Sequence, residues 1–478
     1  MKKHIKFLNH SCFIIYSPEV KILCDPWFKG SAFGDGWSLL YENSHNINAL
    51  DFDYIWISHE HPDHFSIATL NELDGPRKFL FQETQDKKVK SFLEKKGHEV
   101  IELKNNVTVL IGDLNLTCFV CDGFDSSLLV KFPDKKVLLN INDARVDLDN
   151  HLENKIVPHL KGENVDLLMF QFSYASWAGN KGDGKIPRYL QSKTDQKNNI
   201  VIEKISPKMV LPFASFVYFS HEENFYWNDY NWYDHVYKKY NNSNTKLVFP
   251  KPDQNIDLNN YNDQDLKKAN IEALNFWLQK HENICIKHQT KGVTIQQIND
   301  KYDQFIQLLQ NNNSLLSLID KDKNFFIVIK IIDLDLVIKV GLINNSFELV
   351  QNANDEVVAE ISSETTALLF SQLFARGSVT INGRIKFNYE LAHRFFLFFF
   401  IPYANNIGIT FNRFNKVTVK MLDSISRTSV MLSIAHFTEQ SKLKMKVDID
   451  DLFNLLDIHL EEDPSYELFN EEPPNSDI

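Results

Sequence analysis

A short run of histidines with one aspartate carries the clearest chemical signal in the sequence. The run His59-Glu60-His61-Pro62-Asp63-His64 places three imidazoles and a carboxylate on one loop. Nitrogen and oxygen donors without sulfur are typical of working sites for zinc, iron or manganese. The run directly follows an apolar stretch, residues 54–57, that predicts a buried strand. Because open α/β sheets place their sites at the carboxyl ends of strands, the spacing favours a metal site over a His-rich surface loop.

Two more candidate ligands follow other apolar stretches. Asp143 comes just after residues 136–141, and His221 comes after residues 209–213. A dinuclear site needs a carboxylate that bridges the two ions and further ligands from distant strands. An aspartate at a strand end is also common as a turn residue, and a lone histidine there is usually structural. The metal-binding interpretation of both residues therefore depends on the loop that starts at His59.

The elements that must position these residues alternate between strands and helices. Strands are expected over residues 4–8, 12–16, 20–24, 53–57, 78–82, 99–103, 107–111, 114–120, 127–131, 136–141, 166–172 and 209–213, and helices over 67–73 and 84–96. This mixture of alternation and hairpins indicates an α/β domain with partly antiparallel sheets, which we place at residues 1–255.

The composition changes after about residue 255. Helical spacing over residues 265–281 and 301–318 predicts a helical connector, residues 256–323. A smaller α+β domain is expected at residues 324–460, followed by a flexible acidic tail at 461–478. Its predicted elements are strands at 325–331, 334–340, 347–350 and 357–362, a helix at 363–375 with Ser363 as N-cap, a hairpin at 378–387 that turns at Asn382-Gly383, and an apolar helix at 389–403.

Composition also excludes several classes of function. A net charge of -12 argues against a nucleic-acid-binding surface, which needs clustered lysines and arginines. Five scattered cysteines form no disulfide framework, so a reducing cytoplasm is the expected compartment. The longest apolar run, residues 395–401, is too short to span a bilayer, and no signal-peptide core opens the sequence.

Taken together, the candidate ligands resemble those of the metallo-β-lactamase superfamily. The segments Leu50–His59 and Leu211–Phe216, with Ser220-His221, are more specifically similar to the CMP-N-acetylneuraminate hydroxylase family. The resemblance implies an αββα sandwich that holds two divalent metal ions, iron or zinc. It places His59 and His61 on the first ion, Asp63, His64 and His221 on the second ion, and Asp143 between the ions.

One ligand departs from the superfamily pattern. The superfamily usually supplies a third histidine to the first ion from a strand end between His64 and Asp143. Here the matching place holds Asp122 and Asp125, of which we favour Asp125 as the substitute. The only histidine in that interval, His98, falls in a turn after a predicted helix. A site with more oxygen donors would prefer iron or manganese to zinc, and the same change could leave the first site weak.

Two enzymatic hypotheses follow. In the first, an iron site with open positions hydroxylates a sugar nucleotide or an acylated amino sugar with O2. The sequence has no paired Cys-x-His segments of a Rieske domain, so electrons would come from a separate Rieske or ferredoxin partner. In the second, a metal-activated water hydrolyses a phosphoester, lactone or amide. Asp63 would orient that water, and His10 could carry the proton, although a structural hydrogen bond serves His10 equally well.

Basic residues near position 190 could meet a substrate phosphate. They are Lys185, Arg188, Lys193 and Lys197, although a solvated helix face is the more ordinary role for any one of them. A non-enzymatic binding protein with a degraded site is a third hypothesis, which the many retained ligands disfavour. The second domain resembles sterol-carrier-like domains in its order of elements, and we expect it to serve dimerisation or to cover the active site.

Overall fold

The computed structural model describes residues 4–43, 45–121, 125–147, 150–183, 186–230, 232–241, 245–259, 262–313, 326–342, 345–351, 356–406 and 410. The chain divides into two compact units. The first comprises residues 1–175 and 187–289, and the second comprises residues 176–186 and 290–478. The two helices expected to form a connector divide between them, with α6 (Asp263–Glu282) in the first unit and α7 (Ile295–Asn312) in the second.

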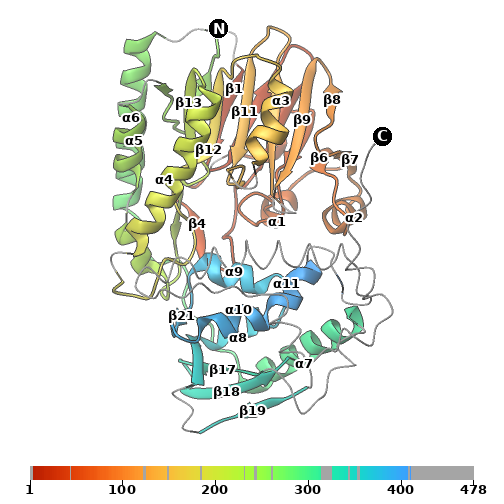
Figure 1. Cartoon of the computed structure of the whole chain (residues 1–478), viewed down its shortest axis with the longest axis vertical. Coiled ribbons are helices and arrows are strands. Elements are labelled where there is room, and N and C mark those ends of the chain that lie inside the picture. Colours follow the sequence, from red (N-terminus) through yellow and green to blue (C-terminus); the bar gives the residue numbers. More distant parts are fainter. Residues whose placement is uncertain are drawn as a thin grey trace, which may run out of the picture. The chain divides into compact units, whose positions relative to one another are not determined.

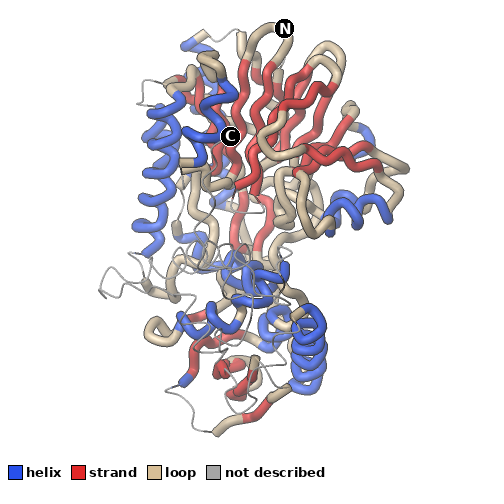
Figure 2. Tube along the Cα trace, turned by 45° about the vertical axis from the view of Figure 1, so that its right-hand side comes forward, coloured by secondary structure: helices blue, strands red, loops and turns tan. Residues whose placement is uncertain are grey.

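Two seven-stranded mixed sheets form the first unit (Figures 1 and 2). The first sheet has the order β16 (Asn255–Ile256), β1 (Ile5–Asn9), β2 (Cys12–Tyr16), β3 (Lys21–Cys24), β5 (Tyr54–Ile57), β6 (Lys78–Gln82) and β7 (Glu99–Leu103). The second has the order β15 (Lys246–Leu247), β13 (Met209–Phe213), β12 (Leu167–Gln171), β11 (Val137–Asn142), β10 (Asp125–Lys131), β9 (Leu114–Cys121) and β8 (Thr108–Ile111). A short pair, β4 (Trp37–Leu39) and β14 (Val217–Phe219), accompanies them.

Each sheet is antiparallel in one half and parallel in the other. Strands β3, β5, β6 and β7 are parallel, as are β11, β12, β13 and β15. The carboxyl ends of parallel strands meet at one edge of a sheet, which is where sites form in α/β proteins. The predicted α/β class with partly antiparallel sheets is therefore confirmed.

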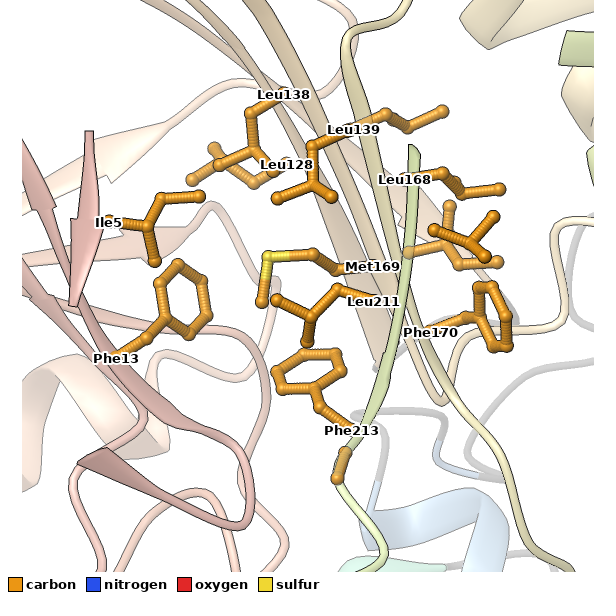
Figure 3. Close-up of a cluster of buried hydrophobic side chains, with 14 of the residues drawn as sticks. Ile5, Phe13, Leu128, Leu138, Leu139, Leu168, Met169, Phe170, Leu211 and Phe213 are labelled. Atoms are coloured by element: carbon orange, nitrogen blue, oxygen red, sulfur yellow. The ribbon is translucent and has the colours of Figure 1, made fainter. Parts of the chain in front are cut away.

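Alternating side chains build the core of the first unit. In β5, Trp56 points into the cluster between the sheets, whereas Ile55 and Ile57 belong to a cluster on the other face of the first sheet. Figure 3 shows side chains of both sheets facing one another across the core, with Ile5 and Phe13 of the first sheet opposite Met169, Leu211 and Phe213 of the second.

Helices cover the outer faces of both sheets. Leu70 of α1 (Ile67–Leu70) and Leu93 of α2 (Lys88–Lys95) pack with the outer cluster of the first sheet. Val201 of α4 (Ile186–Ile205) and Val236 of α5 (Tyr233–Asn241) join the main cluster from the second sheet. A short helix, α3 (Val157–Leu160), follows a π-helical turn at Leu152–Ile156.

The second unit contains a five-stranded mixed sheet and short helices. Its strand order is β19 (Phe347–Leu349), β18 (Leu336–Gly341), β17 (Phe326–Ile331), β20 (Val357–Ile361) and β21 (Lys386–Phe387). The helices besides α7 are α8 (Ser363–Leu369), α9 (Ala375–Asn382), α10 (Ala392–Phe398) and α11 (Phe400–Asn406). The phenylalanines at 395, 396, 398, 399 and 400 are buried in its hydrophobic core. The sterol-carrier-like character of this unit stays a prediction.

Several sequence predictions for the second unit are wrong in detail. The expected hairpin at Asn382-Gly383 is the end of helix α9, where Gly383 adopts a φ of 69°. Glycine favours that left-handed conformation at helix ends as much as in hairpin turns. The expected helix over residues 389–403 is two helices, and α8 is capped by Ser362 rather than Ser363. The predicted tail at 461–478 lies outside the described residues.

None of the helices in the described ranges is both long enough and apolar enough to cross a membrane.

Candidate metal centre

Four potential ligands from three strand ends meet in the first unit. The ligand atoms of His59, His61, Asp125 and Asp143 all lie within 4.8 Å of one another. The two histidines follow β5, Asp143 follows β11, and Asp125 begins β10, which runs antiparallel to β11. His59 Nε2 lies 3.6 Å from Asp125 Oδ1 and 3.4 Å from Asp143 Oδ2. These four side chains form the first candidate site.

A second group lies beside the first and consists of His10, Asp63 and His64, all buried. Asp63 Oδ2 is 3.2 Å from His10 Nε2 and 3.4 Å from His64 Nε2. Asp143 Oδ2 is 3.8 Å from His64 Nε2, so this carboxylate faces both groups. The bridging role expected for Asp143 stays a prediction.

Several buried polar atoms of these groups lack a hydrogen-bond partner among the described residues. Within the described part of the chain, His64 Nε2, Asp63 Oδ1 and Asp143 Oδ1 are buried and make no hydrogen bond. A buried polar atom without a partner costs about 1–3 kcal/mol. Bound divalent cations would provide partners for all three atoms. Nitrogen and oxygen donors of this kind suit iron, zinc or manganese. The residues therefore fit a pair of metal ions.

His221 has a different setting from the one expected. It follows β14, is buried, and its backbone N donates to Asn224 Oδ1 at 3.0 Å, while its Nδ1 accepts from the backbone N of Glu223 at 3.2 Å. In the described ranges, the group around Asp63 and His64 contains His10 in place of His221. Binding of the second ion by His221 thus stays a prediction.

His10 links the first two strands to the site. Its φ of 40° lies in the left-handed region at the tight connection between β1 and β2, and Asn9 Oδ1 accepts a hydrogen bond from its backbone N. The indole of Trp27 packs edge-on against its ring, with centroids 5.5 Å apart. Burial lowers the pKa of His10 more than the neighbouring Asp63 raises it. Beside Asp63, a neutral His10 could serve either of the two roles considered for it, a proton carrier or a structural hydrogen-bond partner.

The carboxylate of Asp25, which the sequence predictions missed, accepts hydrogen bonds from the residues that carry and orient the ligands. Asp25 Oδ1 accepts from the backbone N of Ser58 at 2.8 Å. Asp25 Oδ2 accepts from Ser58 Oγ at 2.7 Å, from His64 Nδ1 at 2.9 Å and from Asn142 Nδ2 at 3.2 Å. All four side chains are completely buried. A hydrogen bond from Nδ1 to a carboxylate holds the lone pair of His64 Nε2 towards a metal ion.

Ser58 fixes the second ring in the same way. Because its hydroxyl donates its one proton to Asp25, its oxygen accepts from His59 Nδ1 at 3.0 Å and from Asn142 Nδ2 at 2.8 Å. The hydrogen-bond network thereby assigns a protonated Nδ1 to His59 and leaves its Nε2 for the first site. We call Asp25, Ser58 and Asn142 the support triad. Asp25 and Asn142 lie where β3 and β11 end, and this was the sequence signal that could have identified them.

The charges of the site are strongly coupled. Burial alone would lower the pKa of His64, but the carboxylates of Asp63 and Asp143 raise it well above its usual value. Burial lowers the pKa of His59 well below its usual value, so His59 is neutral. The pKa of Asp63 is held well below its usual range, against the effect of burial, by His64 and His10. The metal-free site therefore contains an imidazolium at His64.

Metal binding at neutral pH should release a proton from His64. The ion binds the lone pair of His64 Nε2. Because the pKa of His64 is raised, this nitrogen carries a proton at neutral pH, and about one proton per chain should be released. The affinity for the metal ion should fall as pH decreases, because a larger fraction of His64 is protonated and must lose its proton before the ion binds. Titration calorimetry with zinc in two buffers of different ionisation enthalpy measures the released protons. Equal heats in both buffers would contradict this prediction.

The basic residues near position 190 separate into two groups. Arg188 and Lys193 of α4 are exposed, and Lys193 Nζ lies 5.2 Å from the ring centroid of Tyr189. Lys197 lies on the buried face of the same helix. Lys185 and Asp122 lie outside the described residues. His98 is buried away from both candidate sites and accepts a hydrogen bond from the backbone N of Arg77.

A family model described as "Beta-lactamase superfamily domain" matches residues 4–155. This range contains His10, the loop from His59 to His64, Asp125 and Asp143. The chain contains a metallo-β-lactamase superfamily domain. The two-sheet core and the position of the candidate ligands at strand ends agree with that assignment.

Curated relatives are similar over about half of the chain. The cytidine monophosphate-N-acetylneuraminic acid hydroxylase of Danio rerio is 24% identical over 253 residues, which cover 48% of this chain and 40% of that protein. A putative Rieske 2Fe-2S iron-sulfur protein of Mycolicibacterium smegmatis is 33% identical over 186 residues, which cover 36% of this chain and 34% of that protein. The chain spans about half the length of the hydroxylases that it matches.

Similar solved structures include both hydroxylases and hydrolases. CmlA, a diiron β-hydroxylase from Streptomyces venezuelae, has a TM-score of 0.38 and 14% identity, with 53% of this chain and 54% of that chain covered. The isothiocyanate hydrolase from Delia radicum gut bacteria has a TM-score of 0.39 and 11% identity, with 53% of this chain and 98% of that chain covered.

Proposed function

We propose that the chain is an iron-dependent enzyme that hydroxylates a sugar nucleotide or an acylated amino sugar with O2. Electrons would come from a separate Rieske or ferredoxin partner. The observation that carries the proposal is the position of Asp125, whose carboxylate joins His59, His61 and Asp143 in one group.

The donor set of the first site favours iron. It contains two imidazoles and two carboxylates, where the superfamily usually has a third histidine. Iron that activates O2 is held by mixed histidine and carboxylate ligands with open positions, whereas additional nitrogen ligands suit zinc. The similarity to hydroxylases of CMP-N-acetylneuraminate, and to a protein named for its Rieske centre, supports both the reaction class and the electron donor.

The residues divide the work in a definite way. His59, His61 and Asp125 would hold the first ion, Asp63 and His64 the second, and Asp143 would lie between them; bound iron would supply the redox chemistry with O2.

The chain's own groups prepare the site. Asp25 and Ser58 orient both imidazole rings before any ion arrives, which lowers the cost of assembling the site. Neutral His10, hydrogen-bonded to Asp63 and packed against Trp27, provides a buried proton donor or acceptor beside the site.

Hydrolysis of a phosphoester, lactone or amide is the alternative. Asp63 Oδ1 is buried without a hydrogen bond in the described part of the chain, so it could orient an attacking water. The alternative needs neither O2 nor an electron donor, and this difference makes the two functions separable.

Product analysis decides between the two functions. Iron-loaded protein is incubated with CMP-N-acetylneuraminate, O2 and a chemical reductant, and zinc-loaded protein is incubated with the same compound under anaerobic conditions. We expect O2 consumption and a product with one added oxygen atom only in the first reaction. Cleavage of the substrate by the zinc protein without O2 would contradict hydroxylation and support hydrolysis.

A further inference from the structure

One lysine of the first unit is buried on a helix face that otherwise packs into the core. Lys197 is 6% exposed, on the same face of α4 as Leu190, Val201 and Ile205. Lysine is almost never fully buried unless it is paired. In the part of the chain that the structure describes, the ammonium of Lys197 makes neither a hydrogen bond nor an ion pair. A sequence keeps such an unfavourable group mainly where it has a function.

Two amide side chains fix α4 at the edge where the metal centre lies. Gln191 Nε2 donates to Phe172 O at 2.8 Å, and Asn198 Nδ2 donates to Gln171 O at 3.0 Å. Both acceptors lie at the carboxyl end of β12, the strand next to β11, which leads into Asp143. Figure 1 shows α4 lying along β12. Lys197 is the direct neighbour of Asn198 and is held at this edge of the sheet.

The charges that act on Lys197 belong to the candidate metal centre and its border. They are, from the strongest, Asp147, Arg145, Asp143 and Asp125. Arg145 and Asp147 largely neutralise each other through a two-pronged ion pair, with Nε–Oδ1 and Nη2–Oδ2 distances of 2.9 Å. Among the described residues that act on Lys197, the carboxylates left to balance it are Asp143 and Asp125. Burial lowers the pKa of Lys197 more than these carboxylates raise it.

Metal binding should remove the negative charge of Asp125 and Asp143 that offsets the positive charge of Lys197. Once Asp125 and Asp143 coordinate cations, their negative charge is shared with the ions, and Lys197 becomes a buried cation that repels the metal centre. A buried charge without a counter-charge is strongly unfavourable, so the loaded site should attract an anion. We propose that Lys197 binds an oxygen of a carboxylate or phosphate group on the molecule that the metal centre transforms.

This inference rests on one part of the proposed function, the binding of metal ions at the site. It does not require that the reaction is a hydroxylation. It also separates Lys197 from the other basic residues of α4. Arg188 and Lys193 are exposed, so an ion pair between either of them and a ligand is screened by water and contributes little. A charge-assisted hydrogen bond from a desolvated lysine is much stronger.

Anion binding to zinc-loaded protein tests the proposal, because zinc is redox-inert and the assay needs neither O2 nor a reductant. Inorganic phosphate and acetate are titrated in separate calorimetric experiments into the wild type and into Lys197→Met. We expect the variant to keep its zinc and to bind phosphate or acetate about 10- to 100-fold more weakly. The anion that loses more affinity identifies the group, phosphate or carboxylate, that Lys197 recognises.

Two further variants make the result specific. Lys204→Met removes an exposed lysine from the same helix and should leave anion affinity unchanged, whereas Lys197→Arg keeps the charge and should retain part of it. The thermal unfolding temperature of zinc-loaded Lys197→Met should equal or exceed that of the wild type, because an unbalanced buried charge is removed.

Three results would overturn the proposal: no measurable affinity of the wild type for either anion, unchanged affinity of Lys197→Met for both, or loss of zinc and stability from that variant. Failure of the hydroxylation assay would leave this test untouched, so the two failures are distinguishable.

Discussion

Replacing Asp25 by asparagine should weaken metal binding at the second site about 10- to 100-fold, the usual effect of losing a group that orients a ligand. The Asp25 carboxylate accepts the Nδ1 proton of His64 and the hydroxyl proton of Ser58 in a fully buried place. An amide group in that place presents its own protons to these donors. In the neutral form of His64 that binds metal, the one remaining proton would then favour Nε2, the atom that must bind the ion.

The same change should lower the free energy of unfolding of the metal-free protein. At least one buried donor loses its acceptor, which costs about 1–3 kcal/mol. Competition with a chromophoric zinc chelator measures the affinity, and urea denaturation measures the stability.

Asp166 supplies the matched control for Asp25. It is also buried, and its carboxylate accepts from the backbone N of Val137 at 2.9 Å and pairs with Lys208 at 2.7 Å. Asp166→Asn should therefore reduce stability without changing metal affinity. Equal metal affinities of Asp25→Asn and the wild type would show that Asp25 does not orient His64.

Replacing Asp125 by alanine should remove the first ion and leave the second in place. The variant loses an anionic ligand of a group of four, so affinity at the first site should fall by at least about 100-fold, more than the effect of an outer-shell group. Asp125 is the first residue of β10, so the change leaves the interior of the strand intact, and the fold should tolerate it.

Asp125→His should change the metal preference rather than abolish binding. It would restore the nitrogen-rich donor set that the superfamily usually has, and with it a preference for zinc over iron. Anaerobic competition between the two metals, followed by metal analysis, measures the ratio. A ratio identical to that of the wild type would show that residue 125 does not contact the first ion.

The elements and the main ligand loop were predictable because local patterns determine them. Strand β5 and the loop after it were recognised from four apolar residues and the ligand spacing, and Asp143 was recognised from its place after β11. The resemblance indicated the segment of the missing ligand but did not separate Asp125 from Asp122, and the structure brings Asp125 together with His59 and Asp143.

The support triad could not be predicted from the sequence because its residues are far apart along the chain. Asp25 meets Ser58 across 33 positions and Asn142 across 117 positions, and each of these residues alone is ordinary for a strand end. The same limit applies to α4, where the burial of Lys197 and the exposure of Lys193, four residues earlier, depend on which distant residues pack against the helix. At Gly383, a hairpin and a helix end require the same backbone conformation, so composition alone could not separate them.

Iron content is the most direct test of the central claim, that Asp125 completes an oxygen-rich first metal site. Wild-type protein and Asp125→Ala are loaded with iron under anaerobic conditions, freed of excess metal and analysed by mass spectrometry of the bound metal. We predict two irons per chain in the wild type and one in the variant. Two tightly held irons in Asp125→Ala would contradict the claim.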